Sequence, residues 1–264
     1  MAARKGRGGN REGRMSLGEH LLELRKRLFF AAIAVALGTI GGWFLSDWIL
    51  DALQAPIESL SNANGTNAQL NYPTITAAFD IKFQIAFYSG LIMSSPIWLY
   101  QIFAFLVPGL TSKEKKYIFG FFFTAVPLFL LGCCAGWFVL PHIVTLLSGF
   151  ATSDSTSLYT AKEYLDFVMK LVFAIGIAFV LPVFVVLLNF IGVVSGKAII
   201  KAWRIAILAI TLFTAIATPS ADIVSMFLLA IPMVLLYLAA AGVAILHDRR
   251  LDAQKAALEQ ELAA

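Results

Sequence analysis

The sequence predicts an all-α integral membrane protein with six transmembrane helices and both termini in the cytoplasm. Hydrophobic residues make up 59% of its 264 residues and charged residues only 14%, against about 25% charged residues in a typical soluble domain. The mean hydropathy is +0.82. These values exclude a soluble globular enzyme, a disordered chain and a barrel of alternating apolar and polar strands. A bundle of helices remains, because each helix satisfies its own backbone inside a bilayer.

Six uncharged stretches are candidate membrane spans, since a helix needs about 20 apolar residues to cross the hydrocarbon core. They are 28–45, 83–112, 117–140, 171–196, 205–217 and 223–246. In the second stretch Pro108 and Gly109 are expected to stop the helix. The first stretch is too long for the core of a cleaved signal peptide, so we expect a retained first helix. The outer segment 62–67 contains Asn-Gly and predicts a turn.

The fifth and sixth stretches predict a short helical hairpin. Pro219 is expected to end the fifth helix near Ala217. A helix over 205–217 is about 20 Å long, shorter than the roughly 30 Å hydrocarbon core. The link of Pro219 to Asp222 leaves room only for a tight antiparallel turn. We therefore expect a thinned bilayer or a wet recess beside this hairpin.

The distribution of cations predicts the orientation, because cytoplasmic loops of membrane proteins are rich in Lys and Arg. Of 20 such residues, 17 lie before the first span, between spans two and three, between four and five, or after the sixth. The other three are Lys82, Lys162 and Lys170. Both termini are thus predicted to be cytoplasmic, in a multi-pass protein of a bacterial-type plasma membrane.

We predict a single membrane domain over 16–246 with two flanking segments. The basic, Gly-rich segment 1–15 is expected to be disordered. The segment 247–264 is expected to be a cytoplasmic tail, and its Ala- and Glu-rich end predicts a helix.

The chain lacks the common motifs of an enzyme. It has no phosphate-binding loop and no HExxH, and His20, His142 and His247 are isolated in sequence. Cys133 and Cys134 are adjacent inside an apolar stretch, where packing is the expected role. No catalytic residue, metal or cofactor is expected. The net charge of +4 is too small to indicate a nucleic-acid partner.

A six-span secondary transporter of a small solute is the alternative. Such proteins place ionisable or broken-helix sites near the membrane midplane. Pro182 and Pro232 could break helices, but no charged residue lies beside either. Lys170 and Asp166 lie at the outer end of the fourth span, where an i,i+4 ion pair is the simpler interpretation. A membrane scaffold without a ligand is a third possibility.

Segment 16–28 predicts an amphipathic helix that leads into the first span. Ser16 and Glu19 fit a capping box, and four leucines, at 17, 21, 24 and 28, form one face. Glu23 has two interpretations. It lies four residues before Arg27 and can be its local ion partner, or it can belong to an acidic binding site.

Segment 100–116 offers a second lone carboxylate. Thr111 and Glu114 fit another capping box at the start of the third span. Glu114 is therefore either a cap or part of a site. Glu23 and Glu114 would both lie among cations at the cytoplasmic membrane surface. A site there would suit a cationic ligand, and Arg binds carboxylates in bidentate fashion.

At these residues the chain resembles TatC, the core receptor of the twin-arginine protein translocase. The amino-terminal pattern of the resemblance is S-x-x-E-H-L-x-E-L-R-x-R-L over 16–28. It continues with Gln54-Ala55-Pro56, Ser94-Ser95-Pro96-Ile97, Tyr100-Gln101, Phe105, Pro108-Gly109-Leu110, Glu114, Thr218-Pro219, Asp222 and Leu228-Leu229-Ala230-Ile231-Pro232-Met233. These motifs follow the family's order from about residue 16 to 240.

The resemblance implies a receptor that binds twin-arginine signal peptides and supports export of folded proteins. Glu23, Arg25, Phe105 and Glu114 match the family's signal-peptide-binding surface. The residues implied to be structural or partner-contacting are Pro56, Thr218, Pro219, Asp222 and Met226. The implied partners are TatA- and TatB-type single-span proteins and the lipid bilayer, in an oligomeric complex. The implied energy source is the proton-motive force.

The chain departs from the family pattern at three positions. Val180 stands where many members have a glutamate before Leu181-Pro182, and Leu238 stands where many have an acidic residue. Met226 replaces a residue that is often polar. These departures predict more apolar contacts with partner helices, with Thr211, Thr214 and Thr218 as the remaining polar contacts.

Overall fold

The protein is a helical bundle with one small parallel strand pair. The computed structural model describes residues 17–64, 69–71, 74–106, 115–148, 158–217 and 223–263. The helices are α1 (Leu17–Asn64), α2 (Ala77–Met93), α3 (Ser95–Leu106), α4 (Lys115–Ser148), α5 (Ala161–Phe190), α6 (Gly196–Lys201), α7 (Trp203–Ala217) and α8 (Ile223–Ala263). The strands are β1 (Gln69–Asn71) and β2 (Leu158–Thr160), with Leu70 opposite Tyr159. The all-α prediction is right apart from this pair, which joins two distant segments and leaves no periodic signal in sequence.

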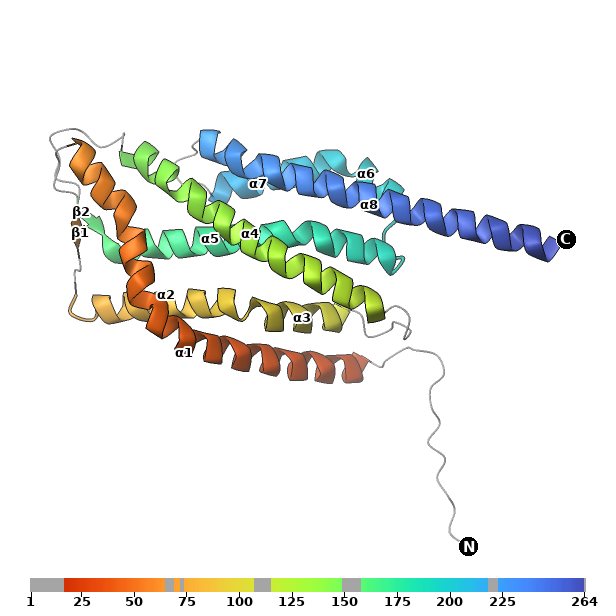
Figure 1. The fold of residues 1–264 in the computed structure, drawn as a ribbon, viewed down its shortest axis with the longest axis horizontal. Helices are drawn as coiled ribbons and strands as arrows, with labels where there is room; N and C mark the ends of the chain where they lie inside the picture. Colours follow the sequence, from red (N-terminus) through yellow and green to blue (C-terminus); the bar gives the residue numbers. More distant parts are fainter. Residues whose placement is uncertain are drawn as a thin grey trace, which may run out of the picture.

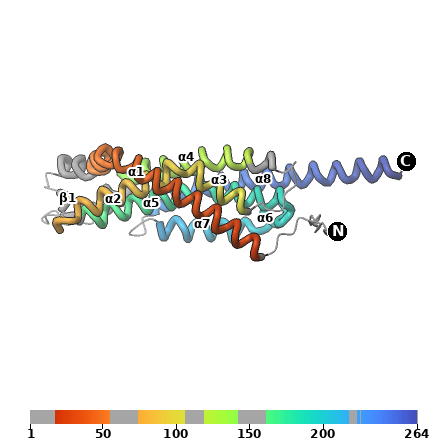
Figure 2. Tube along the Cα trace, turned by 90° about the horizontal axis from the view of Figure 1, so that it is seen from below, coloured from red at the N-terminus to blue at the C-terminus, as the bar shows by residue number. Residues whose placement is uncertain are grey.

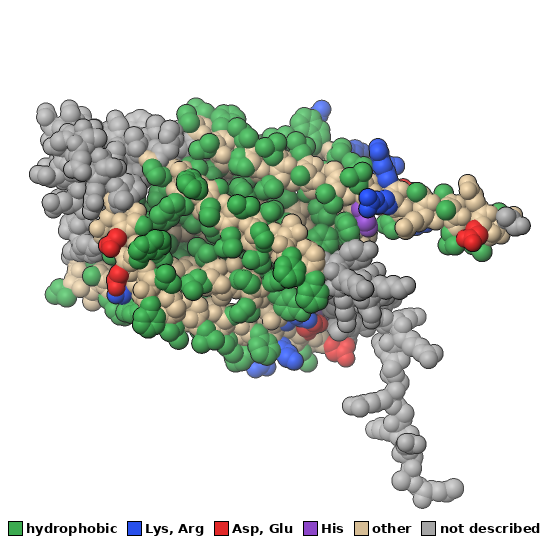
Figure 3. Space-filling model, in the orientation of Figure 1, with side chains coloured by type: hydrophobic (Ala, Val, Ile, Leu, Met, Phe, Trp, Pro, Cys, Tyr) green, Lys and Arg blue, Asp and Glu red, His purple; other side chains and the backbone are tan. Residues whose placement is uncertain are grey.

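The helices run along the long axis of the molecule, and the two ends of the bundle differ (Figure 1). The start of α1 and the end of α8 lie at the same end, whereas β1 and β2 lie at the other. Figure 2 shows the bundle from below as a narrow slab from which α8 projects. Hydrophobic side chains cover its middle, and the charged side chains lie toward the ends (Figure 3). This distribution is that of a protein with a membrane-facing belt.

The core lies where α3, α4 and α5 meet. Phe129 is fully buried, and its ring contacts Trp98 and Phe173 edge-on, with centroids 5.4 and 5.9 Å apart. Phe103 stacks on Phe184 at 4.5 Å. Of the two cysteines predicted to be packing residues, Cys133 is buried in the same core, whereas Cys134 is exposed.

Among the described residues, four helices are long and apolar enough to cross a membrane: Gly18–Gln54, Phe119–Pro141, Ala161–Phe190 and Met226–Ala263. The short apolar helix Trp203–Ala217 packs against α8, as expected for the hairpin. Residues 218–222, where its turn is predicted, lie outside the described residues.

The second predicted span is not one continuous helix. The helix breaks at Ser94, between α2 and α3. Pro96 has no N–H and disfavours helical geometry in the residue before it. Trp98 Nε1 donates to Leu91 O at 2.8 Å, next to the break. A carbonyl freed from a helix needs such a donor in an apolar environment. Trp98 is therefore a structural donor at this break.

Three helices continue past the ends of their predicted membrane spans. α1 continues to Asn64, so the turn predicted over 62–67 does not begin at Asn62. α4 continues through Pro141 to Ser148. α8 continues without interruption to Ala263. The predicted tail is therefore helical, but it is part of the same helix as the sixth span. Packing and helix continuity override the local stop signals at these sites.

Ion pairs hold the helices together at the end of the bundle near β1 and β2. Lys82 Nζ bonds Asp47 at 2.8 Å, and Lys162 Nζ bonds Asp80 at 3.3 Å. Lys170 and Asp166 form the predicted i,i+4 pair at 2.5 Å. Gln84 Nε2 also donates to Asp166, at 2.6 Å. Each of the three lysines assigned to the outer side therefore has an aspartate partner.

Asp248 joins α5, α6 and α8 at the opposite end. Its carboxylate accepts from Asn189 Nδ2 at 2.8 Å and from the Gly196 N–H at 2.7 Å. Asn189 is 3% exposed and also donates to Val194 O. One carboxylate thus accepts hydrogen bonds from α5 and α6, and both donors are far from Asp248 in the sequence.

We expect Asp248→Ala to destabilise the protein by about 1–3 kcal/mol, because it leaves two donors without their acceptor. Asp252→Ala is the matched control, since Asp252 lies one turn further along α8 and is exposed. Thermal unfolding in detergent compares the two. Equal midpoints for both variants would show that the Asp248 hydrogen bonds add no stability.

Candidate functional site

The first turns of α1 carry an ion pair at the end of the bundle where α1 begins and α8 ends. Glu23 and Arg27 lie on one face of the helix because they are four residues apart. Arg27 Nε donates to Glu23 Oε1 at 2.9 Å, and Nη2 donates to the same oxygen at 2.5 Å. The two side chains are 21% and 24% exposed. The local pairing predicted for Glu23 is therefore formed.

Helix α3 supplies the opposite wall of the site. Arg27 Nη1 reaches Gln101 Oε1 at 3.4 Å, across 74 residues of sequence. One turn further along α3, Phe105 stacks on His20 of α1, with ring centroids 4.4 Å apart and planes 14° apart. The ion pair thus lies between the start of α1 and the end of α3.

A long apolar groove opens from this ion pair and follows α1 into the bundle. Its volume is about 860 Å³. Leu24 and Arg27 line its start, Ile40 lies further along α1, and Phe83 and Phe105 line the α2 and α3 sides. The groove begins at an ion pair and has apolar walls, which suits a ligand with a polar head and an apolar continuation.

The second carboxylate oxygen of Glu23 has no hydrogen-bond partner among the described residues. Oε2 is buried, whereas both bonds from Arg27 go to Oε1. A buried charged acceptor without a donor is destabilising. Glu23 can therefore accept a further guanidinium or ammonium donor without giving up Arg27.

The structure brings together only part of the predicted site. Glu23 and Phe105 lie on facing helices as described above. Arg25 is exposed and makes no hydrogen bond or ion pair with other described residues. Its spacing of two residues from Glu23 places it on another face of α1. Glu114 lies outside the described residues.

The predicted structural and partner-contact residues are described only in part. Pro56 lies within α1, and Met226 is partly buried near the start of α8. Thr218, Pro219 and Asp222 lie outside the described residues.

Sequence reasoning missed the role of Gln101 and the groove. The role of Arg27 as the ion partner of Glu23 was predicted from its i+4 spacing. Gln101 carries no local signal, because its partner is on another helix. No group of three His, Cys, Asp or Glu side chains within the described ranges could hold a metal ion.

Val180 and Leu238, which stand where many family members have an acidic residue, differ in their surroundings. Val180 is buried in the core, at 2% exposure, and packs among apolar side chains of α4 and α5. Leu238 is exposed on α8. The apolar residue at 180 is therefore part of a dry helix interface in this chain.

Comparisons with known proteins agree on one family. Residues 19–232 match the family model described as TatC, Sec-independent protein translocase protein. The chain is 41% identical to Sec-independent protein translocase protein TatC of Xylanimonas cellulosilytica, over 93% of this chain and 89% of that protein. It is 37% identical to the TatC of Rothia mucilaginosa, over 95% and 86%. It is also 33% identical to the chloroplastic TATC of Arabidopsis thaliana, over 89% and 68%.

Solved structures are similar over nearly their whole length. A crystal structure of the twin arginine translocase receptor TatC superposes with a TM-score of 0.69 at 30% identity, covering 86% of this chain and 98% of that one. A second, in DDM, has a TM-score of 0.72 at 30% identity, with 85% and 99% covered.

Proposed function

Because the chain belongs to the TatC family of Sec-independent protein translocase proteins, we propose that it is the signal-peptide receptor of a twin-arginine translocase. It binds twin-arginine signal peptides at its cytoplasmic face and supports export of folded proteins. The proton-motive force drives the export, and no bound cofactor or enzymatic step of this chain is required. The family and the apolar helices make it a multi-pass membrane protein.

The buried, unpartnered Oε2 of Glu23 carries this proposal. One guanidinium of the signal peptide donates to Oε2, while Arg27 keeps Oε1 occupied and holds the carboxylate in place. Glu114 receives the second guanidinium. The stacked rings of His20 and Phe105 form a wall beside the pair, and Arg25 belongs to the exposed rim. Arg is preferred over Lys because its guanidinium presents several N–H donors in one plane and stacks on aromatic rings.

The charge distribution supports an orientation with both termini in the cytoplasm. Arg25, Arg27 and Arg249 belong to the end where α1 begins and α8 ends, and the three aspartate-paired lysines to the other. Cytoplasmic ends of membrane proteins carry the excess of cations. We therefore place the receptor site at the cytoplasmic surface of a bacterial-type plasma membrane.

The partners of this chain are TatA- and TatB-type single-span proteins, in an oligomeric complex within the bilayer. The exposed apolar faces of α7 and α8 support such contacts, as Leu212 and Leu235 illustrate. Thr214 offers little to a partner, because it is buried and its hydroxyl bonds the backbone of its own helix. Pro56, Thr218, Pro219, Asp222 and Met226 shape these contacts or the helix ends beside them.

Crosslinking of a twin-arginine signal peptide in membranes tests the receptor site. We expect Glu23→Gln and Glu114→Gln each to weaken peptide binding by about 10- to 100-fold, the equivalent of one charge-assisted contact of roughly 1.5–3 kcal/mol. A twin-lysine peptide should bind the wild type more weakly than the twin-arginine peptide.

Glu19→Gln is the control, because it removes a carboxylate one turn before Glu23 on the same helix. Each variant is first shown to insert and unfold like the wild type. Unchanged crosslinking in both site variants would mean that the two carboxylates serve only local pairing and capping. No observation in the structure favours the small-solute transporter.

A further inference from the structure

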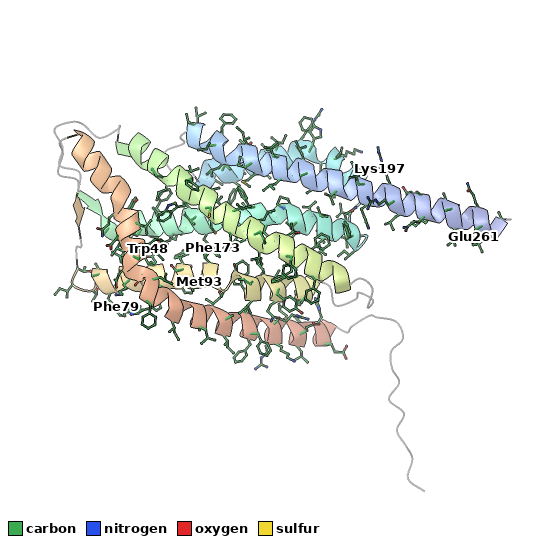
Figure 4. The ribbon with its side chains drawn as sticks, in the orientation of Figure 1. Trp48, Phe79, Met93, Phe173, Lys197 and Glu261 are labelled. Atoms are coloured by element: carbon green, nitrogen blue, oxygen red, sulfur yellow. The ribbon has the colours of Figure 1, made fainter. Side chains whose placement is uncertain are left out.

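Three cations form a single exposed stripe on α6 and the start of α7. The N–H of Ala202 bonds Ala198 O, and Ala202 O accepts from the Ala206 N–H, so helical spacing continues between the two helices. Lys197, Lys201 and Arg204 are spaced i, i+4 and i+7 and are all exposed. Residues with this spacing share one face. We call these three residues the basic stripe; Lys197 is labelled in Figure 4, at the end of the bundle from which α8 projects.

Within the described part of the chain, none of the three cations of the basic stripe forms an ion pair. Asp248 lies against α6, but its oxygens accept from Asn189 and the Gly196 N–H. At the other end of the bundle each lysine of the ion pairs has its own aspartate. Asp248 acts on Lys197 through its charge, but the charges of Lys201 and Arg204 have no carboxylate partner among the described residues.

Part of the basic stripe lies beside the apolar stretch of α8. Gly196 lies against Ala244 and Ile245 of α8, and Tyr237 Oη donates to Ile199 O at 2.5 Å. Further along α7, Ile210 packs against the cluster that contains Met233. Arg204, between Ile199 and Ile210, is thus level with the region of α8 around Tyr237.

This position is costly for a cation without a counter-ion. An unpaired charge beside apolar side chains is destabilising, and a basic side chain there extends toward the headgroups or draws polar groups toward it. A negative group supplied by the surroundings would remove the penalty.

The same face turns apolar immediately beyond the cations. Leu208 and Leu212 continue it at four-residue steps and are 69% and 59% exposed. Trp203 lies at the border, with the Arg204 guanidinium 5.5 Å from its ring centre. Tryptophan favours the headgroup level of a bilayer. The sequence of cations, tryptophan and leucines along one face matches the order of phosphate, interface and acyl chain in a phospholipid.

We propose that the basic stripe is a binding site for an anionic phospholipid of the adjacent leaflet. Lys201 and Arg204 hold the phosphate, Lys197 contacts the outer part of the headgroup, and the acyl chains lie over Leu208 and Leu212. Basic side chains at the ends of membrane helices recognise anionic headgroups in this way. The site goes beyond the receptor function and does not depend on signal-peptide binding.

Native mass spectrometry of the full chain in detergent tests this site. The delipidated protein is titrated with phosphatidylglycerol or with phosphatidylcholine of the same acyl chains. We expect tighter binding of the first phosphatidylglycerol than of phosphatidylcholine. The triple variant Lys197→Gln, Lys201→Gln, Arg204→Gln should lose this affinity by roughly 100-fold, since each cation near an anionic lipid contributes about five-fold. Arg204→Gln alone should lower the affinity for phosphatidylglycerol about five-fold. This single variant tests the site if the triple variant does not fold.

The matched control is the triple variant Arg249→Gln, Arg250→Gln, Lys255→Gln. It removes the same charge from exposed residues of α8 at the same end of the bundle. We expect its phosphatidylglycerol affinity to stay that of the wild type. Equal losses in the two triple variants would show attraction by net charge without a site. Unchanged binding in the stripe variants, or displacement of the lipid by inorganic phosphate alone, would also overturn the proposal.

Discussion

Phe129→Ala is expected to lower the free energy of unfolding by about 3–5 kcal/mol, because it opens a cavity at the centre of the bundle. The ring is fully buried and contacts Trp98 of α3 and Phe173 of α5. Gly176 also packs directly against it. Inside a membrane these contacts, rather than exclusion of water, hold helices together, so their loss is not compensated by lipid.

Phe138→Ala is the matched control for this prediction. It removes the same side chain from the same helix, but Phe138 is 79% exposed. The Phe138 ring contacts lipid, and lipid can fill the space that the ring leaves in the variant. We therefore expect the free energy of unfolding to change by no more than about 0.5 kcal/mol. Equilibrium unfolding in mixed micelles measures both variants. Similar losses for the two phenylalanines would contradict a specifically packed core at the contact of α3, α4 and α5.

Gly38→Ala and Gly90→Ala are each expected to destabilise the protein by about 3 kcal/mol, at the upper end for overpacked sites. A Cβ on Gly38 would lie 2.6 Å from Gly90 O. A Cβ on Gly90 would meet the backbone of Gly38 and Thr39. Backbone atoms cannot rotate away as side chains do, so α1 and α2 would have to separate. Small residues permit this close approach of membrane helices.

Gly41→Ala provides the control on the same helix. A Cβ there would lie 3.5 Å from the flexible end of Met93, an ordinary contact. We expect this variant to unfold at the wild-type temperature or slightly above it, because alanine favours the helix. Thermal unfolding in detergent and the amount of protein inserted in membranes distinguish the three variants. A Gly41→Ala variant as unstable as Gly38→Ala would contradict the prediction, because close approach of the α1 and α2 backbones would then not distinguish the two positions.

Composition and local spacing were enough to predict several features of the protein. The low charge content and apolar stretches predicted a helical membrane protein, because the bilayer imposes the same requirement on every span. The i,i+4 rule predicted the Glu23–Arg27 and Asp166–Lys170 pairs, and both are formed. Motif order predicted the TatC family, and the comparisons confirm it.

The contacts between helices became visible only in the folded protein. Gln101 meets Arg27 across 74 residues, and Asp248 meets Asn189 across 59. The break at Ser94 depends on a donor from Trp98, and the lack of a carboxylate partner for Lys201 and Arg204 among the described residues depends on where Asp248 finds its partners. No local period encodes these contacts, because they arise from which helix faces pack together. Local spacing therefore predicted the charges available to the candidate site, and packing decided which of them are already paired and which are left for a ligand.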